Sequence, residues 1–200
     1  MYGFPKAIQV TDRFHVQKLA LEALQEIRIK YRWEAMDFEN QLILQAKSEN
    51  KPYIPQLLPN GDSVKQLARS RYLLYKSCEK WTRTQKERAK MIFELYPDIK
   101  IAYNLNQQLR GIYNNNNDKH IAMTKLAHWY RNVEESGFKN FNILLNTITF
   151  NYQSILNYFD NRSTNASAES FNAKIKAFRS QFRGVRNIDF FLFRLSNLFA

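Results

Sequence analysis

The sequence predicts a mainly helical protein with one short strand near its N-terminus. Apolar residues recur every three or four positions through most of the chain, which is the spacing of amphipathic helices. Only 5 Gly and 5 Pro occur in 200 residues, whereas an all-β sandwich or barrel needs many tight turns. Apolar and polar residues alternate weakly at residues 7–11, and this alternation predicts the strand.

The N-terminal part is expected to pass from the strand into two helices. The strand stops at Asp12, and apolar residues between Val16 and Ile27 then follow at helical spacing. A second helix is predicted over residues 31–46. The proline-rich stretch 52–61 then breaks the chain into a loop.

Five more helices are predicted between this loop and residue 159, with no fixed-period repeat. The last of them includes the stretch 147–150, which could also form a strand. Capping residues and helix breakers set the boundaries. In order, the helices begin at Ser63, at a capping box of Thr84 and Glu87, at Asp98, at Asp118 and at Phe141, with Pro97 ending the second and Gly137 the fourth.

The composition narrows the class of partner. The chain has 30 Lys or Arg against 18 Asp or Glu, a net charge of +12. This surplus favours a polyanion, with nucleic acid first and an anionic membrane surface second. Cys78 is the only cysteine, which excludes an internal disulfide framework and a cysteine-based zinc cluster. Neither a signal peptide nor a membrane-spanning apolar run is visible, so no membrane partner is expected.

The segment 163–187 predicts a helix with two adjacent stripes. On a helical projection the stripes lie about 100° apart. One stripe is apolar and suits a core, and the other begins with a carboxylate and continues with cations, which could face a phosphate backbone. An ordinary solvated helix face explains the cations equally well. The apolar stripe is Phe171, Ile175, Phe178 and Phe182, and the polar stripe is Glu169, Asn172, Lys176, Arg179 and Arg183, with Gly184 suited to the helix end.

Several segments, taken in order, resemble one family of enzymes. AIQVTDRFHVQKL (7–19) is similar to the segment around the second catalytic aspartate of DDE transposases of the ISL-three insertion-sequence family. NASAESFNAKIKAFR (165–179) is similar to the glutamate helix of these enzymes. RSRYLLYK, WTRTQKER, ELYPDIKIAYNL, LAHWYRNVEESGFKNF and GVRNIDFFLFRL also fit in matching order, so the resemblance covers nearly the whole chain.

The resemblance implies a fold and a division of the chain. The family's catalytic core is RNase H-like, an α/β fold that here would carry a large helical insertion. Residues 1–46 would then be part of this core, with the strand ending at Asp12. Residues 47–160 would form the helical insertion and the return to the core, and residues 161–200 the glutamate helix and the terminal helix.

The resemblance also implies a site. In the family, three carboxylates hold two divalent ions, Mg²⁺ or Mn²⁺, which cleave DNA at the transposon ends and join it to a target. Hard cations prefer the oxygen ligands of Asp and Glu, and two ions can assist both oxygens of a phosphoryl transfer. Asp12 matches the second catalytic Asp and Glu169 the catalytic Glu; His15 also matches a family position, without an assigned role. The expected DNA-binding residues are Asn172, Lys174, Lys176, Arg179, Arg183 and Arg186.

The sequence departs from the family at the first catalytic Asp. Eleven residues precede Asp12, and none of them is Asp or Glu. The chain is therefore expected to be a C-terminal catalytic fragment that binds the ions weakly or not at all and carries out no strand transfer alone. The missing N-terminal part or a second transposase chain is a possible partner besides DNA. A cytoplasmic, nucleoid-associated location in a bacterium is expected.

Two other functions remain open. The chain could be a non-catalytic basic helical module that holds DNA electrostatically, and in that case Asp12 would be an ordinary helix cap. It could also be a structural helical bundle with an incidental charge surplus. Aromatic residues at helical spacing are more often core than base-stacking platforms, so the following are expected to pack inside the insertion: Tyr72, Tyr75, Trp81, Tyr103 and Trp129.

Overall fold

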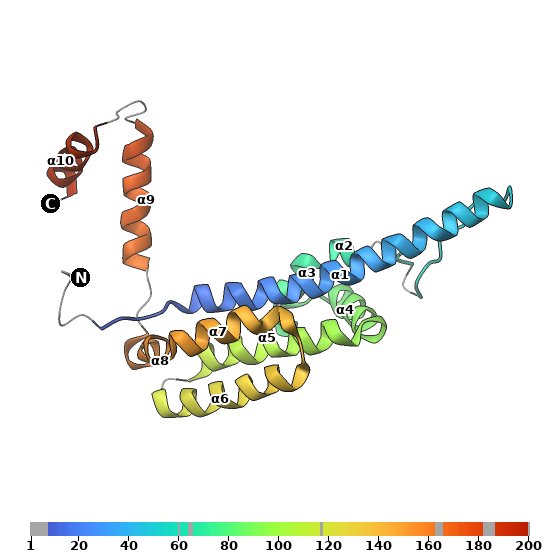
Figure 1. Cartoon of the computed structure of the whole chain (residues 1–200), viewed down its shortest axis with the longest axis horizontal. Helices are drawn as coiled ribbons and strands as arrows, with labels where there is room; N and C mark the ends of the chain where they lie inside the picture. The colour runs from blue at the N-terminus through green and yellow to red at the C-terminus, as the bar shows by residue number, and fades with distance from the viewer. Residues whose placement is uncertain are drawn as a thin grey trace. The chain divides into compact units, whose positions relative to one another are not determined.

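The computed structural model divides the chain into two compact units, Met1–Arg162 and Ser163–Ala200. It describes residues 8–59, 61–63, 66–116, 118–162, 166–181 and 187–199. The first unit holds the following helices, including two 3₁₀ turns (Figure 1): α1 (Arg13–Ser48), α2 (Gln66–Arg69), α3 (Arg71–Tyr75), η1 (Cys78–Lys80), α4 (Arg83–Leu95), α5 (Pro97–Asn115), α6 (Lys119–Ser136), η2 (Lys139–Phe141), α7 (Asn142–Phe150) and α8 (Tyr152–Asn161). The second unit holds α9 (Ala166–Gln181) and α10 (Ile188–Phe199).

The core of the first unit lies between α1, α5, α6, α7 and α8. Its largest fully buried side chains include Trp129, Phe141 and Phe159. Polar anchors cross the same interfaces, because the Asn106 amide donates to the Ala20 carbonyl at 2.5 Å and the Trp129 indole donates to the Leu105 carbonyl at 2.8 Å. These bonds satisfy polar groups that burial would otherwise leave unpaired.

The long helix α1 has two different halves. Residues 31–46 were expected to form a second helix, but the chain continues without a break from Arg13 to Ser48. The buried residues of α1 run from Val16 to Arg28. The second half extends beyond α4 and α5 (cyan in Figure 1) and carries exposed apolar side chains, among them Trp33 and Leu44. The first half is therefore held by the core, Tyr31 and Ala35 at the start of the second half still pack against it, and the remainder extends beyond it.

The predicted strand and the RNase H-like α/β core are wrong for the described part of the chain. It contains no strand, and its one bridge pairs Leu57 with Ser63 in isolation. Residues 8–12 are extended but lie against α8: the Thr11 amide donates to the Ser154 carbonyl at 2.9 Å, and the Asn157 amide donates to the Gln9 carbonyl at 3.0 Å. A strand needs a neighbouring strand to satisfy its backbone groups, and here helix side chains and a helix carbonyl take that role instead.

Several predicted boundaries also change. The capping box forms two residues earlier than expected, with Thr82 and Gln85 in place of Thr84 and Glu87. Pro97 starts α5, and Asp98 accepts a hydrogen bond from the Tyr31 hydroxyl rather than capping the helix. The stretch 147–150 is helical, and Asn151 divides the last predicted helix into α7 and α8. The Asp118 cap and the left-handed Gly137 that ends α6 are confirmed, while Gly184 lies outside the described residues.

Candidate functional site

Asp12 lies at the start of α1 and is the N-cap of this helix. Its half-buried carboxylate accepts a hydrogen bond from the Phe14 amide through Oδ1 at 3.0 Å. An aspartate at this position satisfies one of the free amides of the first turn and places a negative charge at the positive end of the helix. The Asp12 side chain therefore already has a structural role.

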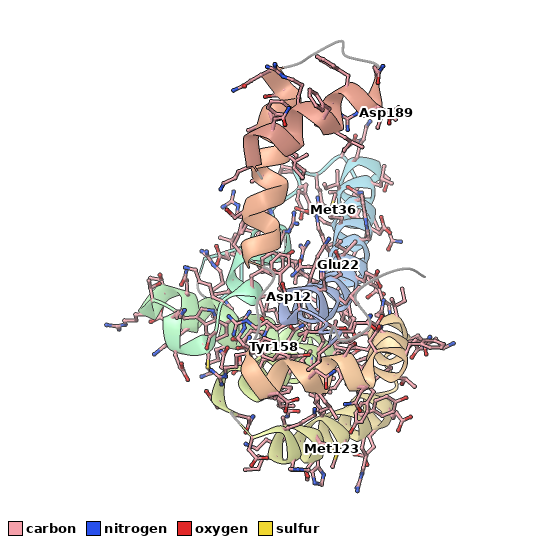
Figure 2. All side chains as sticks on the ribbon, turned by 90° about the vertical axis from the view of Figure 1, so that its left-hand side faces the viewer. Asp12, Glu22, Met36, Met123, Tyr158 and Asp189 are labelled. Atoms are coloured by element: carbon pink, nitrogen blue, oxygen red, sulfur yellow. The ribbon has the colours of Figure 1, made fainter. Side chains whose placement is uncertain are left out.

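The surroundings of Asp12 come from α5 and α8. Figure 2 shows Asp12 and Tyr158 in the same part of the first unit. Tyr113 is fully buried and its ring packs against that of Tyr158 at 5.4 Å between centroids. Burial, and to a lesser extent the charges of Tyr158 and Asp12, raises the pKa of the Tyr113 hydroxyl well above its usual range.

The C-terminal end of α5 reaches the same region and is capped by basic side chains. Arg13 donates to the Asn114 side-chain oxygen at 3.1 Å. Arg162 donates to the backbone carbonyls of Asn114 and Asn116 at 3.1 and 3.0 Å. Arginine on the last carbonyls of a helix offsets the negative end of its dipole. The basic groups beside Asp12 are thus engaged in holding α5.

The described residues do not form a metal centre. No group of three or more His, Cys, Asp or Glu gathers in the part of the chain that the structure describes. The oxygen chemistry of Asp12 suits Mg²⁺ or Mn²⁺, but one carboxylate that also caps a helix is not a complete ligand set. The family's ions fit these residues only in part.

The predicted glutamate helix lies in the second unit as α9. Phe178 is 6% exposed and its ring packs on Phe191 of α10 at 5.5 Å. Lys174, Lys176 and Arg179 are exposed. The backbone of Glu169 and Asn172 is helical, but their side chains lie outside the described residues, as do Arg183 and Arg186 altogether. Asp12 and Glu169 therefore belong to different compact units.

Sequence reasoning placed the DNA contacts on α9 and missed a second basic region. Residues 65–90 contain nine Lys or Arg and two Asp or Glu, so they hold more of the net charge than the C-terminal segment does. The charge density along the sequence could have revealed this region. In the structure, arginines of α1 and α5 join it beside α3.

The comparison with protein families decides the identity. A family profile described as transposase, that of the ISL-three DDE group, matches residues 2–195. The chain belongs to this transposase family. Searches of curated proteins and of solved structures give no significant match. Within the described residues of this transposase, none of the helices combines the length and apolarity required to cross a bilayer.

Proposed function

We propose that this transposase chain supplies part of the machinery that cleaves DNA at transposon ends and joins it to a target. The family match carries the proposal, because it spans residues 2–195 and includes the segments around Asp12 and Glu169. In the proposal, Asp12 and Glu169 are two of the carboxylates that hold Mg²⁺ or Mn²⁺ for phosphoryl transfer. The exposed cations of α9 contact DNA phosphates, together with Asn172, Arg183 and Arg186.

The described residues supply only part of the proposed site. They bring no group of three or more His, Cys, Asp or Glu together. We therefore expect weak divalent-ion binding and no strand transfer from the purified chain alone. The division into residues 1–46, 47–160 and 161–200 stays a prediction.

Mn²⁺ binding, followed by electron paramagnetic resonance, tests the two carboxylates. Asp12→Asn and Glu169→Gln should each weaken the binding, whereas the exposed control Asp37→Asn should not. Asn is as good an N-cap as Asp, so Asp12→Asn keeps the start of α1. Equal Mn²⁺ binding by all four proteins, or DNA cleavage by Glu169→Gln, would contradict the proposal.

A second function is favoured by the observation that Asp12 caps a helix. If the chain is a non-catalytic DNA-binding module, the capping role explains Asp12 completely. Glu169→Gln would then leave both Mn²⁺ binding and DNA binding unchanged. The same titrations therefore separate the two functions.

A further inference from the structure

Two arginines, Arg71 and Arg110, bind Tyr75 of α3, and two more lie near them on α1. Arg71 donates from Nε to the Tyr75 hydroxyl at 3.2 Å, and its guanidinium lies 5.6 Å from the ring centroid. Arg110 of α5 donates to the Tyr75 backbone carbonyl at 2.9 Å. Arg28 and Arg32 are four residues apart on α1 and so lie on the same face, and the charges of Arg32 and Arg71 both act on Arg28. We call these four arginines with Tyr75 the Tyr75 cluster.

The positive charge of the Tyr75 cluster is not balanced by acids. None of its four arginines forms an ion pair with a carboxylate in the described ranges. Arg28 is only 5% exposed, and its guanidinium is held by the Gln25 side chain at 2.6 Å and by the Leu67 carbonyl at 2.8 Å. Burial first, and then the charges of Arg32 and Arg71, lower the pKa of Arg28. Buried arginines are normally paired with an anion.

One donor of the Tyr75 cluster is left without a partner. Nε of Arg32 is buried and forms no hydrogen bond with the described residues. An unsatisfied buried donor costs free energy, and a guanidinium prefers a planar anion that accepts two bonds. The Arg32 guanidinium lies 5.4 Å from the centroid of the Trp33 ring, and no acceptor among the described residues reaches its Nε.

The surface beside the Tyr75 cluster is basic and aromatic. Tyr72 was expected to pack inside the helical region, but its side chain is 73% exposed and its ring meets Tyr75 edge-on at 6.4 Å. Arg69, Lys76 and Lys80 are exposed along the same stretch of chain. Exposed cations with an accessible aromatic ring suit a sugar-phosphate backbone better than a compact free anion.

We propose that the Tyr75 cluster and its exposed neighbours form a DNA-binding surface in the first unit. This surface binds the phosphates of a duplex and does not include α9. The inference rests on the proposed function only in naming DNA as the polyanion. Arg71 and Arg32 contact phosphate oxygens, and the buried Arg28 adds positive charge from beneath. Tyr75 positions Arg71 and Arg110.

Fluorescence anisotropy of the full chain with a labelled 30-bp duplex of arbitrary sequence tests the inference. The Arg32→Gln/Arg71→Gln variant should bind about tenfold more weakly, and the slope of log K against log salt should fall by about 2, because two phosphate contacts are lost. Arg131→Gln/Lys139→Gln is the matched control: it removes the same charge from exposed residues of α6 and η2, and it should leave the slope unchanged. Arg71→Gln alone, at an exposed position, should lower the slope by about 1.

Each result separates this inference from the proposed function. If the wild-type chain binds the duplex and the cluster variants match the control, the inference is overturned while the proposed function stands. If the cluster variants lose duplex binding but substitution of Asp12 and Glu169 leaves Mn²⁺ binding unchanged, the inference stands and the proposed function is contradicted. No duplex binding by the wild type, or cluster-dependent binding only to vesicles with 30% phosphatidylserine, overturns the inference. Circular dichroism checks the fold, and Arg71→Gln alone remains decisive if the double variant unfolds.

Discussion

The cations of α9 and those of the Tyr75 cluster are held in different ways. Lys176 and Arg179 extend from one face of a single helix, and both are exposed, as is Lys174 on another face. In the Tyr75 cluster, by contrast, Arg28 is buried, and Arg71 and Arg110 are fixed by hydrogen bonds to one tyrosine. A side chain that is already fixed loses less conformational entropy on binding. The two surfaces are therefore expected to contribute unequally to DNA affinity per charge.

The difference also shows what supports each surface. α3 is only five residues long and depends on packing from α1, α2 and α4. The Trp81 indole donates to the Leu73 carbonyl at 2.9 Å, the Tyr103 hydroxyl donates to the Lys76 carbonyl at 2.9 Å, and the two rings stack at 5.2 Å. Substitutions that weaken packing in the first unit should therefore reduce DNA binding by the Tyr75 cluster, whereas they should not affect the exposed cations of α9.

Among the substitutions considered, replacing Tyr103 should have the largest effect on stability and on the binding of a duplex by the Tyr75 cluster. Tyr103→Ala should lower the free energy of unfolding by about 3–5 kcal/mol, because a buried ring is lost and a cavity remains. It should also weaken duplex binding, since the segment that carries Lys76 loses its anchor. Tyr103→Phe, which loses only the hydrogen bond to the Lys76 carbonyl, should cost about 1 kcal/mol. Urea unfolding of both variants provides the measurement, and equal stabilities would contradict this account.

High pH should weaken the bundle beneath the Tyr75 cluster. The Asp98 carboxylate accepts the Tyr31 hydroxyl, and this bond raises the pKa of Tyr31 to about 12. The native state then keeps a proton that the unfolded chain releases near pH 10. This contribution to stability is complete below pH 10 and is lost as the pH rises from 10 to about 12.

Tyr31→Phe isolates this contribution. The midpoint temperature of thermal unfolding should fall less steeply between pH 9 and pH 12 for Tyr31→Phe than for the wild type. A residual fall is expected in both, because burial also raises the pKa of Tyr103 and Tyr113. Identical pH profiles would show that the Tyr31–Asp98 bond does not stabilise the fold.

Removing two charges from each surface shows which surface contributes more to duplex affinity. Lys176→Gln/Arg179→Gln removes two charges from α9, and Arg32→Gln/Arg71→Gln removes two from the Tyr75 cluster. We expect both to lower the salt slope by about 2, with the cluster variant losing about three times more affinity, because its arginines are pre-positioned. Anisotropy titrations at several salt concentrations measure both quantities. A larger loss for the α9 variant would reverse the ranking.

The smallest effect is expected at Asp12. Asp12→Ala should lower the free energy of unfolding by about 1 kcal/mol through loss of the N-cap, whereas Asp12→Asn should be nearly neutral. Neither substitution should change duplex affinity at the Tyr75 cluster. Chemical denaturation compares the two variants, and an equal cost for both would mean that the charge of Asp12 matters more than its capping bond.

Local sequence patterns predicted some elements well because neighbouring residues decide them. Asp118 accepts hydrogen bonds from two amides of the following turn, and Gly137 has a φ of 67°, which glycine adopts without strain. The prediction of a strand at 7–11 was wrong because the alternation of apolar and polar residues does not show whether a neighbouring strand is present. Thr84 and Glu87 match the capping pattern, yet the backbone turns at Thr82, where Gln85 completes the box.

The candidate site was only partly accessible to sequence reasoning. The stripe of α9 lies on one helix, so its spacing is visible in the sequence. The Tyr75 cluster combines Arg28, Arg71 and Arg110, which are far apart in the sequence and meet only through the packing of α1, α3 and α5. Tyr72 has the spacing of a core residue, but its place on the outer side of α3 leaves it exposed.

Because α1 is continuous, it fixes the distance between Asp12 and Arg32. Asp12 caps its first turn and Arg32 lies 20 positions later on the same continuous helix, which at a rise of 1.5 Å per residue is about 30 Å. A duplex that lay along this helix with a phosphate at Arg32 would reach Asp12 after about nine base pairs, at 3.4 Å per pair. Inserting or removing residues within α1 would change that interval in steps of about half a base pair.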